Sequence, residues 1–298
     1  MNHLLIRQLR VISISTFAAF AVLLGGCAAT PSQKSLSDWH DAVVAVRDQS
    51  TTTFRGVNAL AREAQIRRAA TLKSLKEEDF QPGLDADAIG VWTRALDILA
   101  EYGAALSSLL SPSLSAGVGD ATKRFGESIV TSSKSNILQK QPGLATAFGK
   151  VGAKIASIAA GRNAQSIMAE TDPAIREVTE HMAKMIGDSH GGEEIGVIGT
   201  VQSAWMVKAD EIRTASFLNA KSPAEKQSVA SNYAAALDQR DASIAALRNL
   251  KSSIQELASS HTRAAAGGSL DTGAMIANIR EQIAFFRDLI KDLKPAKN

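Results

Sequence analysis

Apolar and small residues recur at alternating spacings of three and four along the first long stretch of this chain. This spacing places them on one face of an α-helix and is typical of a coiled coil or a long bundle helix. It predicts a helix that begins at Ser35 and continues toward Phe80, about 66 Å long at 1.5 Å per residue. The stripe consists of Leu36, Trp39, Val43, Val46, Ser50, Thr53, Val57, Leu60 and Ala64.

The same periodicity predicts further helices, which Gly and Pro residues separate. Two of them have strong start signals, namely Asp172 before Pro173 and Ser222 before Pro223, the latter with a capping-box Glu225. No stretch shows sustained period-two alternation with β-branched residues, so no sheet is predicted. The predicted helices span about 87–110, 114–129, 144–162, 172–187, 195–218, 222–264 and 271–294.

Short connections between these long helices favour antiparallel neighbours. The sequence therefore predicts an all-α fold, an elongated antiparallel bundle of long helices with coiled-coil-like seams. The helical bundle domain is expected over residues 35–294, with a tail at 295–298. Residues 188–193 are the best loop candidate, and a loose division of the domain, if it has one, falls there.

The first 26 residues follow a different pattern. Arg7 and Arg10 form a basic segment, and residues 11–24 are a continuous run of apolar and small side chains. This run is too short to span a bilayer, because a spanning helix needs about 20 apolar residues. A short apolar run between a basic segment and small residues is typical of an export signal.

The export signal ends in Leu24-Gly25-Gly26-Cys27, which resembles the lipobox of bacterial lipoproteins. The resemblance covers residues 1–27 only. It implies that Cys27 receives a diacylglyceryl group, and that a signal peptidase recognises Leu24, Gly25 and Gly26 and cuts before Cys27. The new amino group would then be acylated. The alternative, a buried helix whose cysteine packs as a small hydrophobe, leaves the basic-apolar-small-Cys order unexplained.

This resemblance divides the chain into a cleaved signal peptide (1–26), a lipidated tether (27–34) and the bundle domain. Lipoproteins with Asp after the cysteine tend to stay in the inner membrane. Ala28 stands at that position, so the resemblance implies a lipid anchor at the periplasmic face of the outer membrane. Two or more acyl chains anchor a protein stably.

Charge and composition exclude some classes of function. Loss of Arg7 and Arg10 from the 33 Lys and Arg leaves 31 against 30 Asp and Glu, so no nucleic-acid partner is expected. Cys27 is the only cysteine, so no internal disulfide is expected, and lipidation accounts for it. The covalent lipid is the only cofactor expected.

Glu177, His181 and His190 are the weak candidates for a metal site. Glu177 and His181 lie four residues apart on one helix face, and the ligand types suit zinc or iron. Such pairs are common on solvated helix faces, and no second Glu-x-x-His is present, so no metal is expected. No nucleophile elbow, His-Glu-x-x-His or phosphate-binding loop occurs, so the chain is not expected to be an enzyme.

Residues 144–162 combine small residues four apart with three basic side chains, Lys150, Lys154 and Arg162. A tightly packed bundle helix with its lysines in solvent is the preferred interpretation. The alternative is a helix that acts on a membrane.

The sequence thus predicts a non-enzymatic, lipid-anchored periplasmic protein that is a helical scaffold or docks a protein partner of the envelope. A membrane-active bundle that rearranges like a pore-forming toxin, and a metal-binding or hydrolytic envelope protein, are the alternatives.

Overall fold

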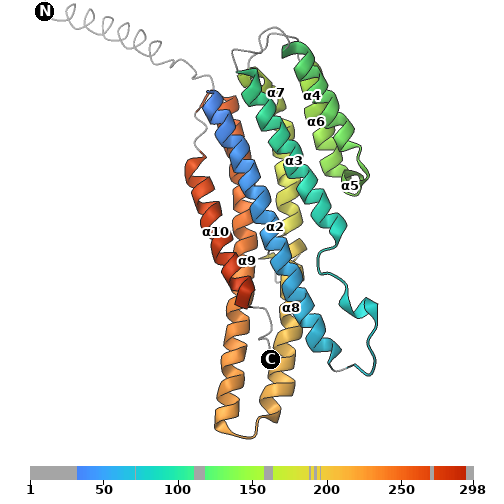
Figure 1. Ribbon diagram of the computed structural model, residues 1–298, viewed down its shortest axis with the longest axis vertical. Coiled ribbons are helices and arrows are strands. Elements are labelled where there is room, and N and C mark those ends of the chain that lie inside the picture. The colour runs from blue at the N-terminus through green and yellow to red at the C-terminus, as the bar shows by residue number, and fades with distance from the viewer. Residues whose placement is uncertain are drawn as a thin grey trace, which may run out of the picture.

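The computed structural model describes residues 32–70, 72–110, 118–157, 164–187, 189–190, 193–194, 196–268 and 272–292. These residues form an elongated bundle of helices (Figure 1), which confirms the predicted all-α fold. The helices are α2 (Gln33–Ala69), η1 (Glu77–Phe80), α3 (Ala86–Leu109), α4 (Val118–Ser133), α5 (Asn136–Gln139), α6 (Pro142–Ser157), α7 (Ala164–Ile186), α8 (Gly196–Asp210), η3 (Glu211–Phe217), α9 (Pro223–Ala265) and α10 (Gly273–Asp292).

Helix α2 begins earlier and ends sooner than its pattern predicts. Its N-cap is Ser32, whose hydroxyl accepts a hydrogen bond of 3.0 Å from the backbone N–H of Ser35. The 37 residues of α2 give a length of about 55 Å. The helix ends at Ala69. Leu72 and Leu75 beyond it are exposed, so these side chains gain no burial that would stabilise a longer helix.

Helix α2 lies at the centre of the bundle, and α3, α8, α9 and α10 all pack against it. In Figure 1, α10 lies on one side of α2 and α9, and the pair α4 and α6 lies on the other side of the molecule, beside α3 and α7. One continuous hydrophobic core draws side chains from before and after residues 188–193. Its largest fully buried members include Trp39, Phe54, Tyr102 and Phe148.

The predicted helix start at Asp172 is wrong. Helix α7 begins at Ala164 and runs through Pro173, which lies in its interior. Proline lacks a backbone N–H and normally ends a helix at such a point. Here the turns before Pro173 also carry a buried face, formed by Ala164, Ile167 and Met168, so tertiary packing extends the helix.

The small residues of α6 are used in its contact with α4. A Cβ atom added at Gly152 would lie 2.7 Å from the backbone oxygen of Gly126, so the two backbones approach each other closely. Lys150 and Lys154 do not extend freely into solvent, because they form ion pairs with Glu177 and Glu170 on α7, at 2.6 and 3.0 Å. The structure thus shows a tightly packed bundle helix.

A short antiparallel pair of strands, β1 (Ser189–His190) and β2 (Glu193–Glu194), lies at the loop predicted at 188–193 and extends one residue beyond it. Each strand has two residues, which is too short to produce an alternating pattern, so the expectation of no sheet missed it.

Helices α8 and η3 form one continuous rod, in which η3 is a π-helix. A turn at Ser222 then starts α9, as predicted, with the Ser222 hydroxyl accepting a 3.2 Å hydrogen bond from the backbone N–H of Glu225. Residues 205–240 are here called the distal hairpin, and its turn between η3 and α9 extends beyond the other helices at the end opposite to the start of α2 (Figure 1).

Candidate functional site

The predicted lipidation site lies outside the described residues. Leu24, Gly25, Gly26 and Cys27 all precede residue 32, so lipidation stays a prediction from the sequence. None of the described helices is both long and apolar enough to cross a membrane.

The weak metal candidates have other partners or lie outside the described side chains. Both carboxylate oxygens of Glu177 accept hydrogen bonds from Lys150, at 2.8 and 2.6 Å. The imidazole of His181 covers Gly143, where an added Cβ would lie 2.4 Å from the ring. The side chain of His190 is among those not described. Within the described ranges, no group of three His, Cys, Asp or Glu side chains could hold a metal ion.

A buried chain of hydrogen bonds, here called the Tyr102 network, joins α3, α7 and α9. The Tyr102 hydroxyl lies 2.7 Å from Thr171 Oγ1 and 2.8 Å from His261 Nε2. His261 Nδ1 lies 3.0 Å from Asp172 Oδ1, which also accepts a 2.8 Å hydrogen bond from the Thr262 hydroxyl. Arg176, one turn after Asp172, pairs with the other carboxylate oxygen at 3.0 Å.

Burial decides the protonation of this network. Burial lowers the pKa of His261, although its contact with Asp172 opposes this shift. The pKa of Asp172 is lowered, chiefly by the hydrogen bond from His261. The hydrogen bond from Thr262 and the charge of Arg176 lower it further, although partial burial of the carboxylate opposes the shift. Burial also raises the pKa of the Tyr102 hydroxyl. The network near neutral pH is therefore an ionised Asp172, a neutral His261 that donates from Nδ1, and a neutral Tyr102 that donates to Nε2.

Aromatic rings seal this network from solvent. The Trp39 ring packs edge-on against Tyr102 at 5.8 Å between centroids and lies 5.7 Å from His261.

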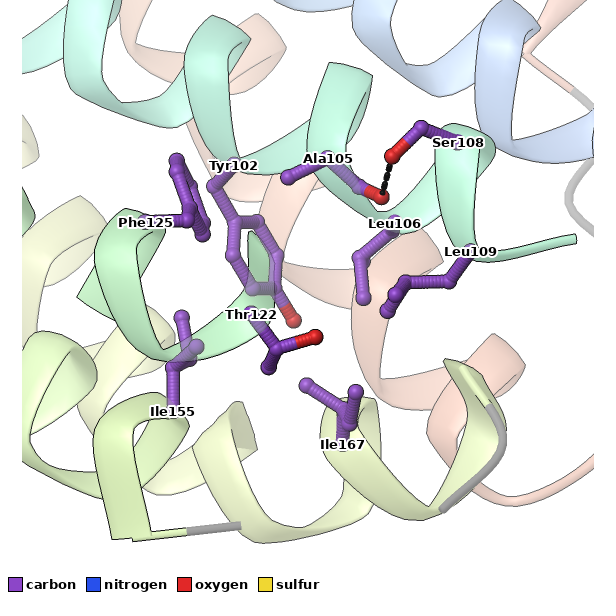
Figure 2. Close-up of a pocket in the computed structure, with 9 residues that line it drawn as sticks. All are labelled: Tyr102, Ala105, Leu106, Ser108, Leu109, Thr122, Phe125, Ile155 and Ile167. Carbon is purple, nitrogen blue, oxygen red and sulfur yellow. Dashed lines mark hydrogen bonds between the residues drawn. The ribbon is translucent and has the colours of Figure 1, made fainter. Parts of the chain in front are cut away.

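A pocket of about 40 Å³ lies beside the Tyr102 ring (Figure 2). It is smaller than typical ligand sites, which are about 300–1,000 Å³. Its lining is mostly apolar, with Leu106, Leu109, Phe125, Ile155 and Ile167 around the ring (Figure 2).

The Asp–His–Tyr order would suit proton transfer, but a reacting molecule needs access to the terminal hydroxyl. Tyr102 and His261 are both fully buried. The network therefore holds three helices together and fixes the positions of their side chains.

A second polar group, here called the hairpin cluster, joins α2 to the distal hairpin. Its centre is Lys208 on α8, whose side chain is only 8% exposed and whose Nζ lies 3.0 Å from Glu63 Oε1. The same ammonium donates a 2.8 Å hydrogen bond to Gln239 Oε1 on α9. Arg67 donates to Glu63 Oε1 at 3.0 Å and to Glu211 Oε2 at 3.4 Å. The cluster thus consists of Glu63, Arg67, Lys208, Glu211 and Gln239.

The bonding of Glu63 is uneven. Its Oε1 accepts from both Lys208 and Arg67, whereas its Oε2 is buried and has no hydrogen-bond partner. Burial lowers the pKa of Arg67, but its contacts with Glu63 and Glu211 outweigh this effect and raise it. The cluster contains two basic side chains, Lys208 and Arg67, and two acidic ones, Glu63 and Glu211, so its formal charges balance.

The hairpin cluster borders a cavity of about 290 Å³, here called the hairpin cavity. The cavity size is near the lower end of small-molecule sites. Its wall also includes Ser216 of η3 and Asn232 and Ala235 of α9. The hairpin cluster therefore borders a space close to the size of a small-molecule site, and π-helical turns such as η3 occur often at functional sites.

Sequence reasoning missed both polar groups, although their spacing carries a signal. Lys208 lies three residues after Trp205 and four before Ile212, so it continues the apolar stripe of its helix. His261 lies four residues after Leu257 on the stripe of α9. A polar residue at an apolar stripe position is expected to be buried and to have a hydrogen-bonding partner.

A comparison of this chain with protein-family models, curated proteins and solved structures finds no match.

Proposed function

We propose that this protein is a non-enzymatic lipoprotein, anchored through Cys27 at the periplasmic face of the outer membrane, that holds a docking surface for an envelope protein. The lipobox supports the anchor. Because α2 begins at Gln33, the tether shortens to residues 27–32, which reach at most about 22 Å, so the start of α2 would lie close to the bilayer.

The observation that carries the docking proposal is where the exposed apolar side chains lie. Most of the large hydrophobic residues that are exposed among the described residues belong to the end of α2, the segment after it, and the distal hairpin. They are Ile66, Leu72, Leu75, Met206, Val207, Phe217 and Leu218. Leu218 is 75% exposed. Exposed apolar groups that gather at one end of a molecule are typical of an interaction surface.

This end is remote from the expected anchor. Helix α2 starts beside the tether and runs about 55 Å to its other end, and the distal hairpin extends farther in the same direction (Figure 1). A rigid bundle of this kind supports the role of a spacer that presents an apolar surface away from the membrane.

Site-specific photo-crosslinking in cells tests the proposal. A photoreactive residue at position 218 should give one main cross-linked protein in high yield. The same residue at position 137, where Ile137 is exposed but lies on α5, should give no such product. The double variant Phe217→Ser/Leu218→Ser should abolish the product from a photoreactive residue at position 206. Equal products from positions 218 and 137 would contradict a dedicated surface.

The anchor requires a separate test, since the docking surface could exist without it. Cys27→Ser should remove the lipid, which mass spectrometry of the mature N-terminus detects, and should release the protein from the membrane fraction. An unmodified Cys27 in the wild-type protein would end the lipoprotein proposal.

A further inference from the structure

The polar part of the hairpin cavity is lined mainly by side chains that donate hydrogen bonds. Lys208 lines it, although only 8% of this side chain is exposed. Arg67 lines it too and is about one-third exposed, at 35%. The other polar side chains of the wall are those of Glu63, Ser216, Asn232 and Gln239. Which of these groups can still form a hydrogen bond decides what the cavity binds.

The two cations keep donors beyond those bonded within the hairpin cluster. An ammonium has three N–H donors, and Lys208 directs two of them to Glu63 and Gln239. A guanidinium has five, and Arg67 directs three of them to Glu63 and Glu211. Because Gln239 accepts from Lys208 through Oε1, its amide nitrogen is left to donate elsewhere.

The one carboxylate of the wall offers no acceptor to a bound molecule. Glu63 Oε1 already accepts from Lys208 and Arg67. Glu63 Oε2 is buried with almost no accessible surface, so a molecule in the cavity does not reach it. Glu211 pairs with Arg67 but is not among the residues that line the cavity. The charged groups that a bound molecule meets are therefore donors, and they suit an acceptor.

The charge of the lining side chains favours a single negative charge on the bound molecule. Lys208 and Arg67 against Glu63 give the lining residues a formal charge of 2 − 1 = +1. Glu211 makes the cluster as a whole neutral, but Arg67 and Glu211 are 35% and 31% exposed, so solvent screens the added charge. A dianion would leave a larger excess of negative charge, and a cation would lie beside Lys208 and Arg67 without an acceptor.

The rest of the cavity wall is apolar. It consists of Ile212, Val229, Ala235 and Ala236. The volume of about 290 Å³ leaves room beside the cations for a few carbon atoms, which would lie against these side chains and leave water. A molecule that matches both parts of the wall has one anionic group and a short apolar chain.

We propose that the hairpin cavity binds a small organic monocarboxylate with a short apolar chain. Its carboxylate accepts hydrogen bonds from Lys208 and Arg67, and its chain contacts Ile212 and Val229. Inorganic phosphate shares the anionic oxygens but lacks the chain, so the experiment includes both. This site does not depend on the docking function proposed above.

Calorimetric titration of the full mature chain, lipidated and held in nanodiscs, tests the site, with empty nanodiscs as the blank. The probes are isovalerate, its neutral analogue isovaleramide, its cationic analogue isopentylamine, and inorganic phosphate. Isovalerate should bind at least about tenfold more tightly than isovaleramide, because hydrogen bonds to a charged acceptor are about twice as strong as neutral ones. Isopentylamine should not bind. Equal binding of isovaleramide or isopentylamine, tighter binding of phosphate, or no binding of isovalerate would overturn the proposal.

Two variants locate the binding. Lys208→Met should raise the Kd of isovalerate at least about tenfold. Ala235→Trp should do the same without removing a buried charge, because Ala235 is exposed on α9 and lines the cavity. Ala234→Trp is the matched control, since Ala234 is the exposed neighbour on α9 and is not among the lining residues. Unchanged Kd in Ala235→Trp, or an equal rise in Ala234→Trp, would show that isovalerate does not bind in this cavity.

Discussion

The Tyr102 network and the hairpin cluster both join three parts of the bundle through buried polar groups, but only the first is completely bonded. None of the side-chain nitrogen or oxygen atoms of Tyr102, Thr171, Asp172 and His261 is buried without a hydrogen bond. The hairpin cluster leaves Glu63 Oε2 without a partner and borders a cavity of about 290 Å³.

The parts of the bundle around the Tyr102 network and around the hairpin cluster also differ in how closely they are packed. Trp39 and the close contact of α4 with α6 belong to the densely packed half of the bundle. The distal hairpin carries a π-helix and exposed apolar side chains. The polar side chains of the first group are fixed by their hydrogen bonds, whereas the second group has an unpartnered oxygen and lies beside a cavity.

The largest effect is expected at the centre of the Tyr102 network. Asp172→Ala removes the acceptor of the His261 Nδ1–H and of the Thr262 hydroxyl, and it leaves a buried donor without a partner. We expect the free energy of unfolding to fall by about 3 kcal/mol, as measured by urea denaturation. Asp38→Ala, which breaks only the exposed pair with Lys34, should change it by less than about 1 kcal/mol. Similar values for the two variants would show that the network does not stabilise the bundle.

The next effect tests the tight packing of α4 against α6. In Gly152→Ala the new methyl group would lie 2.7 Å from the Gly126 backbone oxygen, which cannot move freely. We expect a destabilisation of about 1–2 kcal/mol by thermal or urea unfolding. Gly149→Ala is the control, because its methyl group would lie 3.7 Å from Ser133 Oγ. This variant should gain about 0.5–1 kcal/mol from helix propensity. Tolerance of both changes would contradict the close approach of the helices.

We expect His261 to make the free energy of unfolding depend on pH. Its pKa in the folded protein is lowered by burial, so below the ordinary histidine pKa of about 6.5 the unfolded chain binds a proton that the folded chain resists. This contribution to stability is fully present above pH 6.5. It is lost as pH falls, by up to about 1.4 kcal/mol per pH unit, until the folded pKa is reached.

Urea unfolding between pH 7.5 and 5 measures this slope. His261→Gln should be less stable at neutral pH and should reduce the slope. His181→Gln should retain it, since His181 lies outside the network. A slope that is unchanged in His261→Gln would assign the titration to another group.

The smallest effect is expected in the hairpin cluster. Lys208→Met removes the ammonium, but Arg67 still donates to Glu63 Oε1 and the Glu63 side chain is partly exposed, so the loss should be only about 1 kcal/mol. The double variant Lys208→Met/Glu63→Gln should recover part of this loss, because no carboxylate then remains without its ammonium partner. Both are measured by urea unfolding. A loss as large as that of Asp172→Ala would remove the distinction between the two groups.

Much of the bundle could be predicted from the sequence, because helix faces are encoded locally. The stripe that contains Trp39 and Val43 is buried as its spacing predicts, and the capping signals at Ser222 start α9 at the predicted residue. The candidate site could not be predicted in the same way. Lys208, Glu63 and Gln239 are far apart in the sequence, and which of them meet depends on how three helices are placed.

The sequence by itself determined the helical class and most element positions, since each depends on neighbouring residues, whereas the lipid anchor at Cys27 stays a prediction. Only the tertiary structure decided that α7 continues through Pro173, that Asp172 faces His261, and that Lys208 meets Glu63 beside a cavity. The physical reason is that helix periodicity tells which side chains share a face, whereas the packing of helices decides which faces meet and how well their polar groups are bonded.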